Sequence, residues 1–266
     1  MKKNIFLQTP DLESLKKEGL MCIDMHYHSS FSDGQVGIDD TIKVFKNIGV
    51  GISVTDHNVV RGSLDACKQK KVNAIPAVEV GTKDCKDILF YFYDPKELEQ
   101  FYNKMIKNSM VNNKGFDLWK TTHSAEEYID EASKYNCLIS LPHPFSMRPK
   151  RSYEMFSESK KLFRKLNAIE VINSSQSHES NLSAIKWAKE SGKAFTGGSD
   201  CHKINLVGST ITAAYANNIG EFLDEIKKKK NKVIGGAIGN GERFDLNWTI
   251  FKNNIVPFKA RDLKDL

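Results

Sequence analysis

Residues 21–34 read MCIDMHYHSSFSDG, a largely apolar stretch that changes into a polar one rich in histidine, serine and aspartate. The apolar part, 21–26, predicts a strand that is buried on both faces. His26 and His28 are two positions apart on this extended segment, so their side chains point to the same side. Imidazole and carboxylate groups are ligands of Zn, Mn and Fe(II). The stretch therefore predicts a metal site at the end of a buried strand.

The same change from an apolar strand to metal-binding residue types recurs along the chain. Further strands are predicted at 51–57, 73–80, 87–94, 137–143, 168–174, 194–200 and 232–239. The amphipathic stretches between them predict helices at 39–48, 96–108, 126–135, 181–191 and 218–230. Alternating strands and helices predict a parallel sheet, and at this length a closed barrel is favoured over an open sheet.

Five of the seven histidines lie at the ends of predicted strands, together with several carboxylates. In a barrel of parallel strands, these ends converge on the face where active sites are built. Charged groups placed there are costly unless they are paired or bound to metal. The set exceeds the roughly four to six ligands of one ion. It therefore predicts two or three divalent ions of Mn, Fe or Zn that share a bridging carboxylate.

The composition is that of an ordinary globular protein: 266 residues, 40% of them hydrophobic, with a formal net charge of +6. The mild positive charge permits phosphate-bearing substrates without demanding nucleic acid. Five cysteines without a C-x-x-C pair argue against a secreted disulfide scaffold and against a cysteine-based zinc site. We therefore expect a reducing, cytoplasmic location. We expect no membrane segment, because no apolar run approaches the roughly 20 residues that span a bilayer.

Six short motifs together resemble those of the polymerase and histidinol phosphatase (PHP) superfamily. They are DMHYHSSFSDG, VTDHN, PAVEVGT, LPHPF, EVIN and GGSDCH. The resemblance runs from about residue 20 to 210. We expect a single PHP domain over 1–266, in which 211–266 add a last helix, a late strand and a C-terminal extension. The resemblance implies an α/β fold, a distorted (β/α)7 barrel similar to a TIM barrel, with a trinuclear metal site at the C-terminal ends of the strands.

The resemblance also implies which residues hold the first two ions. His26, His28 and Asp200 match ligands of the first metal. Glu79 matches the carboxylate that bridges the metals, and His143 matches a ligand of the second.

The remaining positions that match the family concern the third ion and the substrate. His57, His202 and Asp33 match ligands of the third metal. His57 and His202 can also help to protonate a leaving group where they are not fully committed to metal. Arg148 falls where family members often carry a basic contact to phosphate.

The chain departs from the family at the start of the fourth strand, where many relatives place a histidine and this chain has Asp87. Asp87 can bind the second metal through oxygen, which favours a harder ion such as Mn²⁺ or Fe²⁺. Alternatively, the alignment slips, and Asp84 or no residue at all serves as this ligand.

Three further polar residues are interpreted as supports of the metal ligands. Asp24 and Asp56 lie close to ligand histidines in sequence and are expected to orient them. Asn173 has two interpretations that remain open, as a donor to a substrate oxygen or as an amide that stabilises its loop.

These observations favour a metal-dependent phosphoesterase that acts on a small phosphorylated metabolite or nucleotide. A metal-bridging hydroxide would attack phosphorus in line, and Arg148 would offset charge on the non-bridging oxygens. A nuclease or phosphodiesterase acting on nucleic acid or oligonucleotides is the main alternative, for which RPKRSYEMF at 148–156 offers a short basic track. A non-catalytic interaction module stabilised by metal and an amide or lactone hydrolase also remain open. The substrate, the native metal and the oligomeric state do not follow from the sequence.

Overall fold

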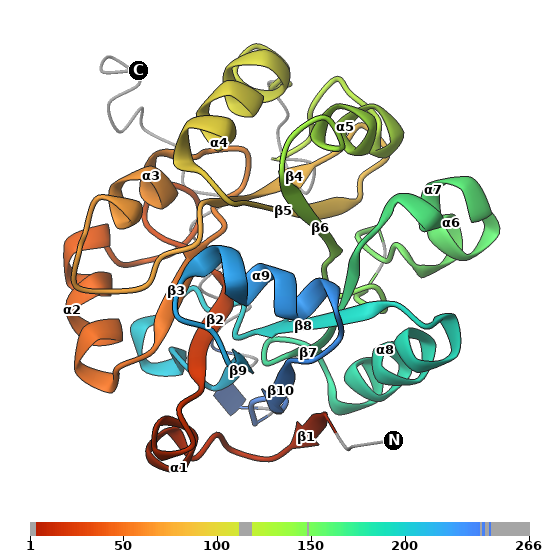
Figure 1. Ribbon diagram of the computed structural model, residues 1–266. Coiled ribbons are helices and arrows are strands. Elements are labelled where there is room, and N and C mark those ends of the chain that lie inside the picture. The colour runs from red at the N-terminus through yellow and green to blue at the C-terminus, as the bar shows by residue number, and fades with distance from the viewer. Residues whose placement is uncertain (1–3, 112–118, 148, 240, 243–244, 246–266) are drawn as a thin grey trace.

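The computed structural model describes residues 4–111, 119–147, 149–239, 241–242 and 245. The C-terminal extension from 246 and Arg148 lie outside the described residues. The described part is an α/β fold with two five-stranded sheets (Figure 1). Among its helices, none is both long enough and apolar enough to cross a membrane.

The first sheet joins strands from both ends of the chain, in the order β1-β10-β9-β2-β3. In that order, the strands are Ile5–Leu7, Lys232–Gly235, Thr210–Ala214, Met21–Tyr27 and Gly51–Val54. The second sheet holds β4 to β8 in chain order. Its strands are Ala77–Gly81, Asp87–Phe92, Cys137–Leu141, Ala168–Asn173 and Ala194–Gly198.

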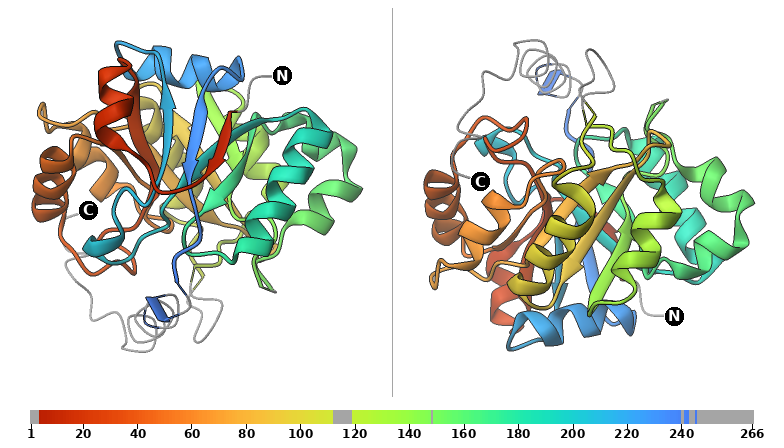
Figure 2. Two further views of the ribbon diagram at one scale, coloured as in Figure 1. Left: turned by 90° about the horizontal axis from the view of Figure 1, so that it is seen from below. Right: turned by 90° about the horizontal axis from the view of Figure 1, so that it is seen from above.

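The helices lie around the strands, and α9 crosses in front of them in the view of Figure 1. Figure 2 shows the same arrangement from two further directions. The nine α-helices are Leu12–Lys17, Ile38–Ile48, Arg61–Cys67, Pro95–Phe101, Ala125–Ala132, Tyr153–Glu158, Lys160–Lys165, His178–Ser191 and Ile219–Lys227, counted within the described residues. A π-helical turn at Tyr102–Ile106 follows α4, and a short 3-10 turn spans Ile204–Leu206.

Local sequence explains where several helices begin and end. The capping box of Ser124 and Glu127 is present at the start of α5. Helix α2 ends at Gly49, whose φ of 64° suits a residue without a side chain. Helix α8 begins at His178, three residues before the predicted start, because the Ser177 side chain accepts a hydrogen bond from the amide of Ser180.

The strand directions differ from the expected parallel arrangement. Strand β5 is antiparallel to both β4 and β6, and β9 is antiparallel to β2 and β10. For β5 the reason is its connection: only residues 82–86 separate it from β4, and a parallel crossover needs a dozen residues or more. As a consequence, β5 starts at the edge where β4 ends.

The expected closed (β/α)7 barrel is not formed by the described strands, which make two separate sheets. Isolated bridges join the sheets at two points, between Tyr27 and Cys201 and between His57 and Glu79. Both bridges lie beside predicted metal ligands. The two sheets therefore approach one another where the site is built.

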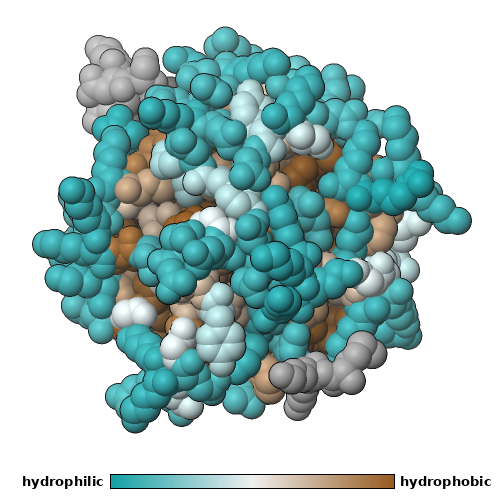
Figure 3. All heavy atoms as spheres, in the orientation of Figure 1, coloured by the Kyte–Doolittle hydropathy of each residue, from teal (hydrophilic) through white to brown (hydrophobic). Residues whose placement is uncertain are grey.

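The prediction of strands buried on both faces is confirmed for β4 to β7, in which every residue is buried. One face of β5 packs Phe90 and Phe92 against α4 and α5. The other face packs Leu89 and Tyr91 against Met25 of β2 in the first sheet. The surface seen in Figure 3 is mostly hydrophilic, with apolar atoms visible between the helices. The apolar interior thus fixes the strands whose ends carry the polar residues.

Candidate metal centre

The nine residues predicted as metal ligands meet at one end of the two sheets. Strand β2 and the loop after it carry His26, His28 and Asp33, and His57 follows β3. The second sheet and its loops contribute Glu79, Asp87, His143, Asp200 and His202. All but His143 are classed as buried residues, and the side chain of His143 is only 10% exposed.

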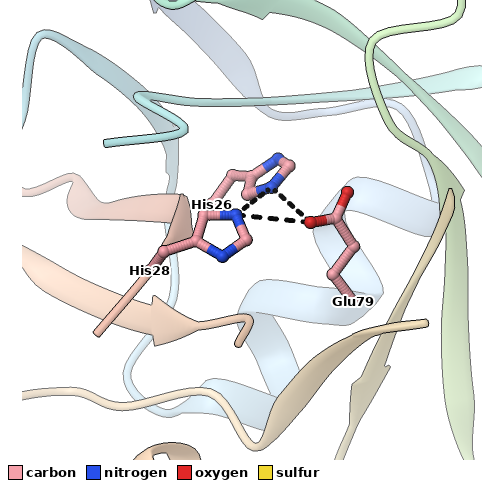
Figure 4. Close-up of side chains that lie close together, drawn as sticks. All are labelled: His26, His28 and Glu79. Atoms are coloured by element: carbon pink, nitrogen blue, oxygen red, sulfur yellow. Dashed lines mark hydrogen bonds and ion pairs between the residues drawn. The ribbon is translucent and has the colours of Figure 1, made fainter. Parts of the chain in front are cut away.

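Glu79 lies at the centre of this group. Its Oε2 atom is 3.3 Å from Nε2 of His26 and 3.3 Å from Nε2 of His28, and Figure 4 shows both rings facing the carboxylate. The same oxygen is 3.2 Å from Nδ1 of His57. The other oxygen, Oε1, is 3.2 Å from Nε2 of His143. One buried carboxylate therefore contacts four imidazoles.

Asp200 and Asp33 complete the site on the side of His28 and His202. Oδ1 of Asp200 is 3.2 Å from Nε2 of His28 and 3.5 Å from Nε2 of His26. Oδ1 of Asp33 is 3.2 Å from Nε2 of His202 and 3.5 Å from Nδ1 of His28. The three carboxylates and the imidazoles form one continuous network.

The donor set fits divalent metal ions. Four overlapping groups of three residues each bring one ligand atom per residue within 4.8 Å of the others. The groups are His26–His28–Glu79, His26–His143–Asp200, His28–Asp33–His202 and His57–Glu79–Asp87. Within the described residues, the buried Nδ1 atom of His143 has no hydrogen-bond partner, and those of His28 and His57 face carboxylate oxygens at 3.5 and 3.2 Å without hydrogen-bond geometry. Such nitrogens need either a proton acceptor or a metal, and this mixed set of imidazoles and carboxylates suits Zn, Mn or Fe.

The carboxylates control the charge of the imidazoles. Burial opposes the charged form of His28, but hydrogen bonds to Asp200 and Glu79 outweigh it and raise its pKa to about 10. In the same way, Glu79 outweighs the effect of burial on His143 and raises the pKa of that ring to about 9. At His57 burial prevails and lowers the pKa to about 4. Without metal, protons on His28 and His143 therefore supply the positive charge that the carboxylates require.

Two of the predicted ligands have strained backbones. The φ angles are 26° at His143 and 51° at Asp200, in the left-handed region that residues other than glycine rarely adopt. Each conformation is held by its surroundings. The amide of His143 donates to Oε2 of Glu170, and the amide of Asp200 donates to the carbonyl oxygen of His26. Strain of this kind costs about 1–3 kcal/mol per residue and concentrates at functional sites.

Glu170 is a site residue that the sequence reasoning noted at a strand end but did not include among the site residues. Its Oε1 atom is 2.9 Å from Nδ1 of His26, and its Oε2 atom accepts the amide of His143 at 2.8 Å. A carboxylate on Nδ1 fixes the ring so that Nε2 faces Glu79. The EVIN motif contains Glu170, so the sequence did mark this residue as a candidate for the site.

Asp24 and Asp56 support the loops instead of the imidazole rings they were expected to orient. Asp24 accepts backbone amides of His26, Ser199 and Gly208 at 3.4, 2.8 and 3.1 Å. Burial raises the pKa of Asp24 to about 6. Asp56 accepts the amide and the hydroxyl of Ser29 at 2.7 and 2.6 Å. Both carboxylates thus position backbone that carries ligand histidines.

The contacts of Asn173 match the second of its two interpretations. Its Nδ2 group donates to Oε2 of Glu170 at 2.9 Å and to Oδ2 of Asp200 at 3.1 Å. Its Oδ1 atom accepts the amide of Ser175 at 3.0 Å. The side-chain amide therefore links two acidic residues of the site to the following loop.

The two candidate ligands near the start of β5, Asp84 and Asp87, lie in different surroundings. Asp84 accepts the amide of Ala125 at the start of α5, which engages its carboxylate there. Asp87 lies in the group with His57 and Glu79. Asp87 also forms an ion pair with Lys150, whose Nζ is 2.6 Å from Oδ1. The sequence reasoning placed Lys150 in a basic track but not at the metal site.

Trp119 is a second neighbour that sequence reasoning missed. Its ring stacks on His57, with the ring centroids 5.1 Å apart and an angle of 21° between the planes. Its backbone lies so close to Gly81 that a Cβ atom at Gly81 would be 2.2 Å from the Trp119 carbonyl oxygen. No sequence pattern around Trp119 indicated this contact, which depends on tertiary structure.

Comparisons with known sequences found one family model and one curated relative. A family model described as PHP-associated matches residues 178–231. The uncharacterised protein MJ0417 of Methanocaldococcus jannaschii is 28% identical over 229 residues, which are 80% of this chain and 82% of that protein.

Solved structures share the fold. One is a two-domain protein of Bacteroides vulgatus with a predicted PHP-like metal-dependent phosphoesterase, at a TM-score of 0.55 and 20% identity, covering 95% of this chain and 74% of that one. Another is Endonuclease Q with a duplex that has an abasic lesion at the active site, at a TM-score of 0.62 and 17% identity, covering 86% of this chain and 67% of that one.

The fold, with the histidines and carboxylates gathered at its strand ends, defines a candidate metallohydrolase site. The motifs, the PHP-associated model matched at 178–231 and the shared architecture make the chain similar to proteins of the PHP superfamily.

Proposed function

We propose that this protein is a metal-dependent phosphoesterase that hydrolyses a small phosphorylated metabolite or nucleotide. The observation that carries the proposal is Glu79, a buried carboxylate in contact with four imidazoles from both sheets. Divalent ions in such a site act as Lewis acids and lower the pKa of water toward neutrality. Two or three ions would be held by His26, His28, Asp33, His57, Glu79, Asp87, His143, Asp200 and His202.

The other site residues would bind the ions, orient the ligand rings or transfer protons. His26, His28 and Asp200 would hold the first ion, and Asp33 and His202 would take part in holding another. Glu170 holds the ring of His26 through Nδ1 and so keeps Nε2 directed into the site. His57 and His202 are the candidates for proton transfer to a leaving group where they are not fully committed to metal.

Arg148 remains the proposed contact to the phosphoryl oxygens. Its neighbours in sequence support the proposal, because the Pro149 carbonyl oxygen accepts a hydrogen bond from Lys86 and Lys150 pairs with Asp87. A guanidinium near the site would strengthen its contact as charge moves onto the oxygens in the transition state. Arg148→Ala is therefore expected to slow turnover by roughly 30- to 1,000-fold and to leave metal content unchanged.

A nuclease is the second candidate, favoured by the fold shared with Endonuclease Q. The basic side chains of Lys150 and Arg151 lie in the loop next to the site, and the guanidinium of Arg151 lies 5.3 Å from the ring centre of Phe145. Such residues suit a nucleic-acid backbone.

Steady-state hydrolysis of three substrates tests the proposal: p-nitrophenyl phosphate, its bis ester and a carboxylic ester. The protein would be loaded in turn with Mn²⁺, Fe²⁺ or Zn²⁺. We expect hydrolysis of the phosphate esters, its loss in Glu79→Gln, and no change in His178→Gln, which alters an exposed histidine at the start of α8. Preference for the bis ester would favour the nuclease. Hydrolysis of the carboxylic ester alone would overturn the proposal of a phosphoesterase.

A further inference from the structure

The corner of the metal centre at Asp87 contains a cation that belongs to the chain itself. Asp87 is 3% exposed, and its Oδ1 atom is 2.6 Å from Nζ of Lys150. The same aspartate lies in one ligand group with His57 and Glu79. The ammonium group therefore binds a carboxylate that would otherwise be available to a metal ion.

The position of Lys150 is determined by several contacts of its loop. The start of β5 binds two consecutive residues of that loop, because Lys86 donates to the Pro149 carbonyl oxygen at 2.5 Å and Asp87 binds Lys150. The amides of Ser152 and Tyr153 both donate to the carbonyl oxygen of Pro144. Because the loop is held on both sides of Lys150, the fold places the ammonium group beside Asp87.

Lys150 carries its charge into contact with a buried carboxylate. A lysine is ordinarily a cation at neutral pH, and its Nζ forms an ion pair with Oδ1 of Asp87 at 2.6 Å. A permanent positive charge next to Asp87 repels a divalent ion that would use the same carboxylate. It also neutralises part of the negative charge for which such an ion would be needed.

We propose that the ammonium group of Lys150 takes the place of the second divalent ion, the one that Asp87 would otherwise hold together with Glu79. This inference rests on the proposed function and refines it. The loaded protein then binds two ions, and the ammonium group of Lys150 is the third cation of the site. Because an ammonium group has three N–H donors and Asp87 occupies one of them, Lys150 can also donate to an oxygen of the phosphate substrate.

Metal content separates this arrangement from a trinuclear centre without any measurement of activity. The protein would be loaded with excess Mn²⁺ or Zn²⁺, freed of unbound metal by gel filtration and subjected to elemental analysis. We expect two ions per chain in the wild type and three in Lys150→Met, which removes the charge and keeps an unbranched side chain. Lys150→Gln provides a second neutral variant if the first fails to fold.

Lys83→Met is the control, because it removes the charge of an exposed lysine in the link between β4 and β5 and leaves Lys86, Asp87 and Lys150 in place. It should bind two ions, as the wild type does. Three ions in the wild type, or equal numbers in the wild type and both Lys150 variants, would overturn the proposal. Failure of the loaded wild type to hydrolyse any phosphate ester would contradict the proposed function, whereas the metal count would still decide the role of Lys150.

Discussion

Glu170 supports the metal centre without being one of its predicted ligands. It contacts Nδ1 of His26 with one oxygen and the amide of His143 with the other. It therefore fixes the orientation of one ligand ring and the strained backbone of a second ligand, whose φ is 26°. Because both effects depend on a charged acceptor, a neutral amide of the same shape should weaken them.

Replacing this carboxylate tests its role at the scale of a single residue. We expect Glu170→Gln to fold and to lower metal affinity by about 10- to 100-fold, since the His26 ring loses its charged hydrogen-bond acceptor. A titration against a metal-chelating dye measures this change. Glu190→Gln, an exposed position at the end of α8, serves as the control. Equal affinities for Glu170→Gln and the wild type would show that His26 does not depend on Glu170.

Among the elements, strand β8 determines how closely the second sheet approaches the first. A Cβ atom at Gly198 would lie 2.4 Å from the backbone nitrogen of His26 and 2.5 Å from its Cβ. These neighbours are fixed parts of β2, not the ends of flexible side chains. Only a glycine allows the end of β8 to pass this close to the ligand.

We expect Gly198→Ala to push β2 and β8 apart and to destabilise the metal-free fold by about 1–3 kcal/mol. The displacement of His26 should also reduce metal binding. Urea unfolding of the metal-free protein measures the first effect. Gly236→Ala is the control, because a Cβ atom there has no neighbour within 4 Å among the described residues. If both variants unfold at the same urea concentration, the close approach does not constrain the fold.

Elements with a strong local pattern could be predicted from the sequence, and those defined by tertiary contacts could not. The apolar runs predicted eight strands near their observed positions, and the histidines at their ends predicted the site. Strand β9 was missed because Thr210 and Thr212 make its sequence only partly apolar, although Thr212 is buried with its hydroxyl bonded to the backbone of Gly197. The antiparallel direction of β5 follows from the short link before it, residues 82–86, and not from the apolar pattern of the strand itself.

The candidate site likewise combines residues that could be predicted from the sequence with contacts that depend on tertiary structure. The predicted ligands converge because parallel and antiparallel strands alike bring their polar ends to one edge. The ion pair between Asp87 and Lys150 joins residues 63 positions apart and has no local signature. The stacking of Trp119 on His57 likewise depends on how two loops pack.

For the whole molecule, the paired charges make the stability of the metal-free protein depend on pH. The pKa of His28 is raised to about 10 and that of His143 to about 9, against about 6.5 for an unfolded histidine. Their contribution is fully present below pH 6.5 and is lost as pH rises through 9 and 10. On the acid side, the pKa of Glu79 is lowered by the histidine charges, so its contribution is lost as pH falls below about 4.

We therefore expect the melting temperature of chelator-treated protein to fall by roughly 5–10 °C between pH 7 and pH 10. His57, with a pKa lowered to about 4, adds a loss of stability as pH falls below about 6.5. Differential scanning calorimetry from pH 5 to 10 measures the profile. The metal-loaded protein should lack the alkaline decline, because its ligands are already deprotonated. A flat profile for the metal-free protein would contradict the assigned charges.

The order of the strands has a consequence for how the protein matures during synthesis. Strands β4 to β8 are neighbours in both sequence and space, so their sheet can assemble as the ribosome releases residues 77–198. Strand β2 can pair early with β3, but its other neighbour β9, and β10, the partner of β1, lie within residues 210–235 and emerge later. His26 and His28 are translated before the other predicted ligands but reach their final place among the last. We therefore expect His26 and His28 to bind metal only after β9 and β10 have joined the first sheet.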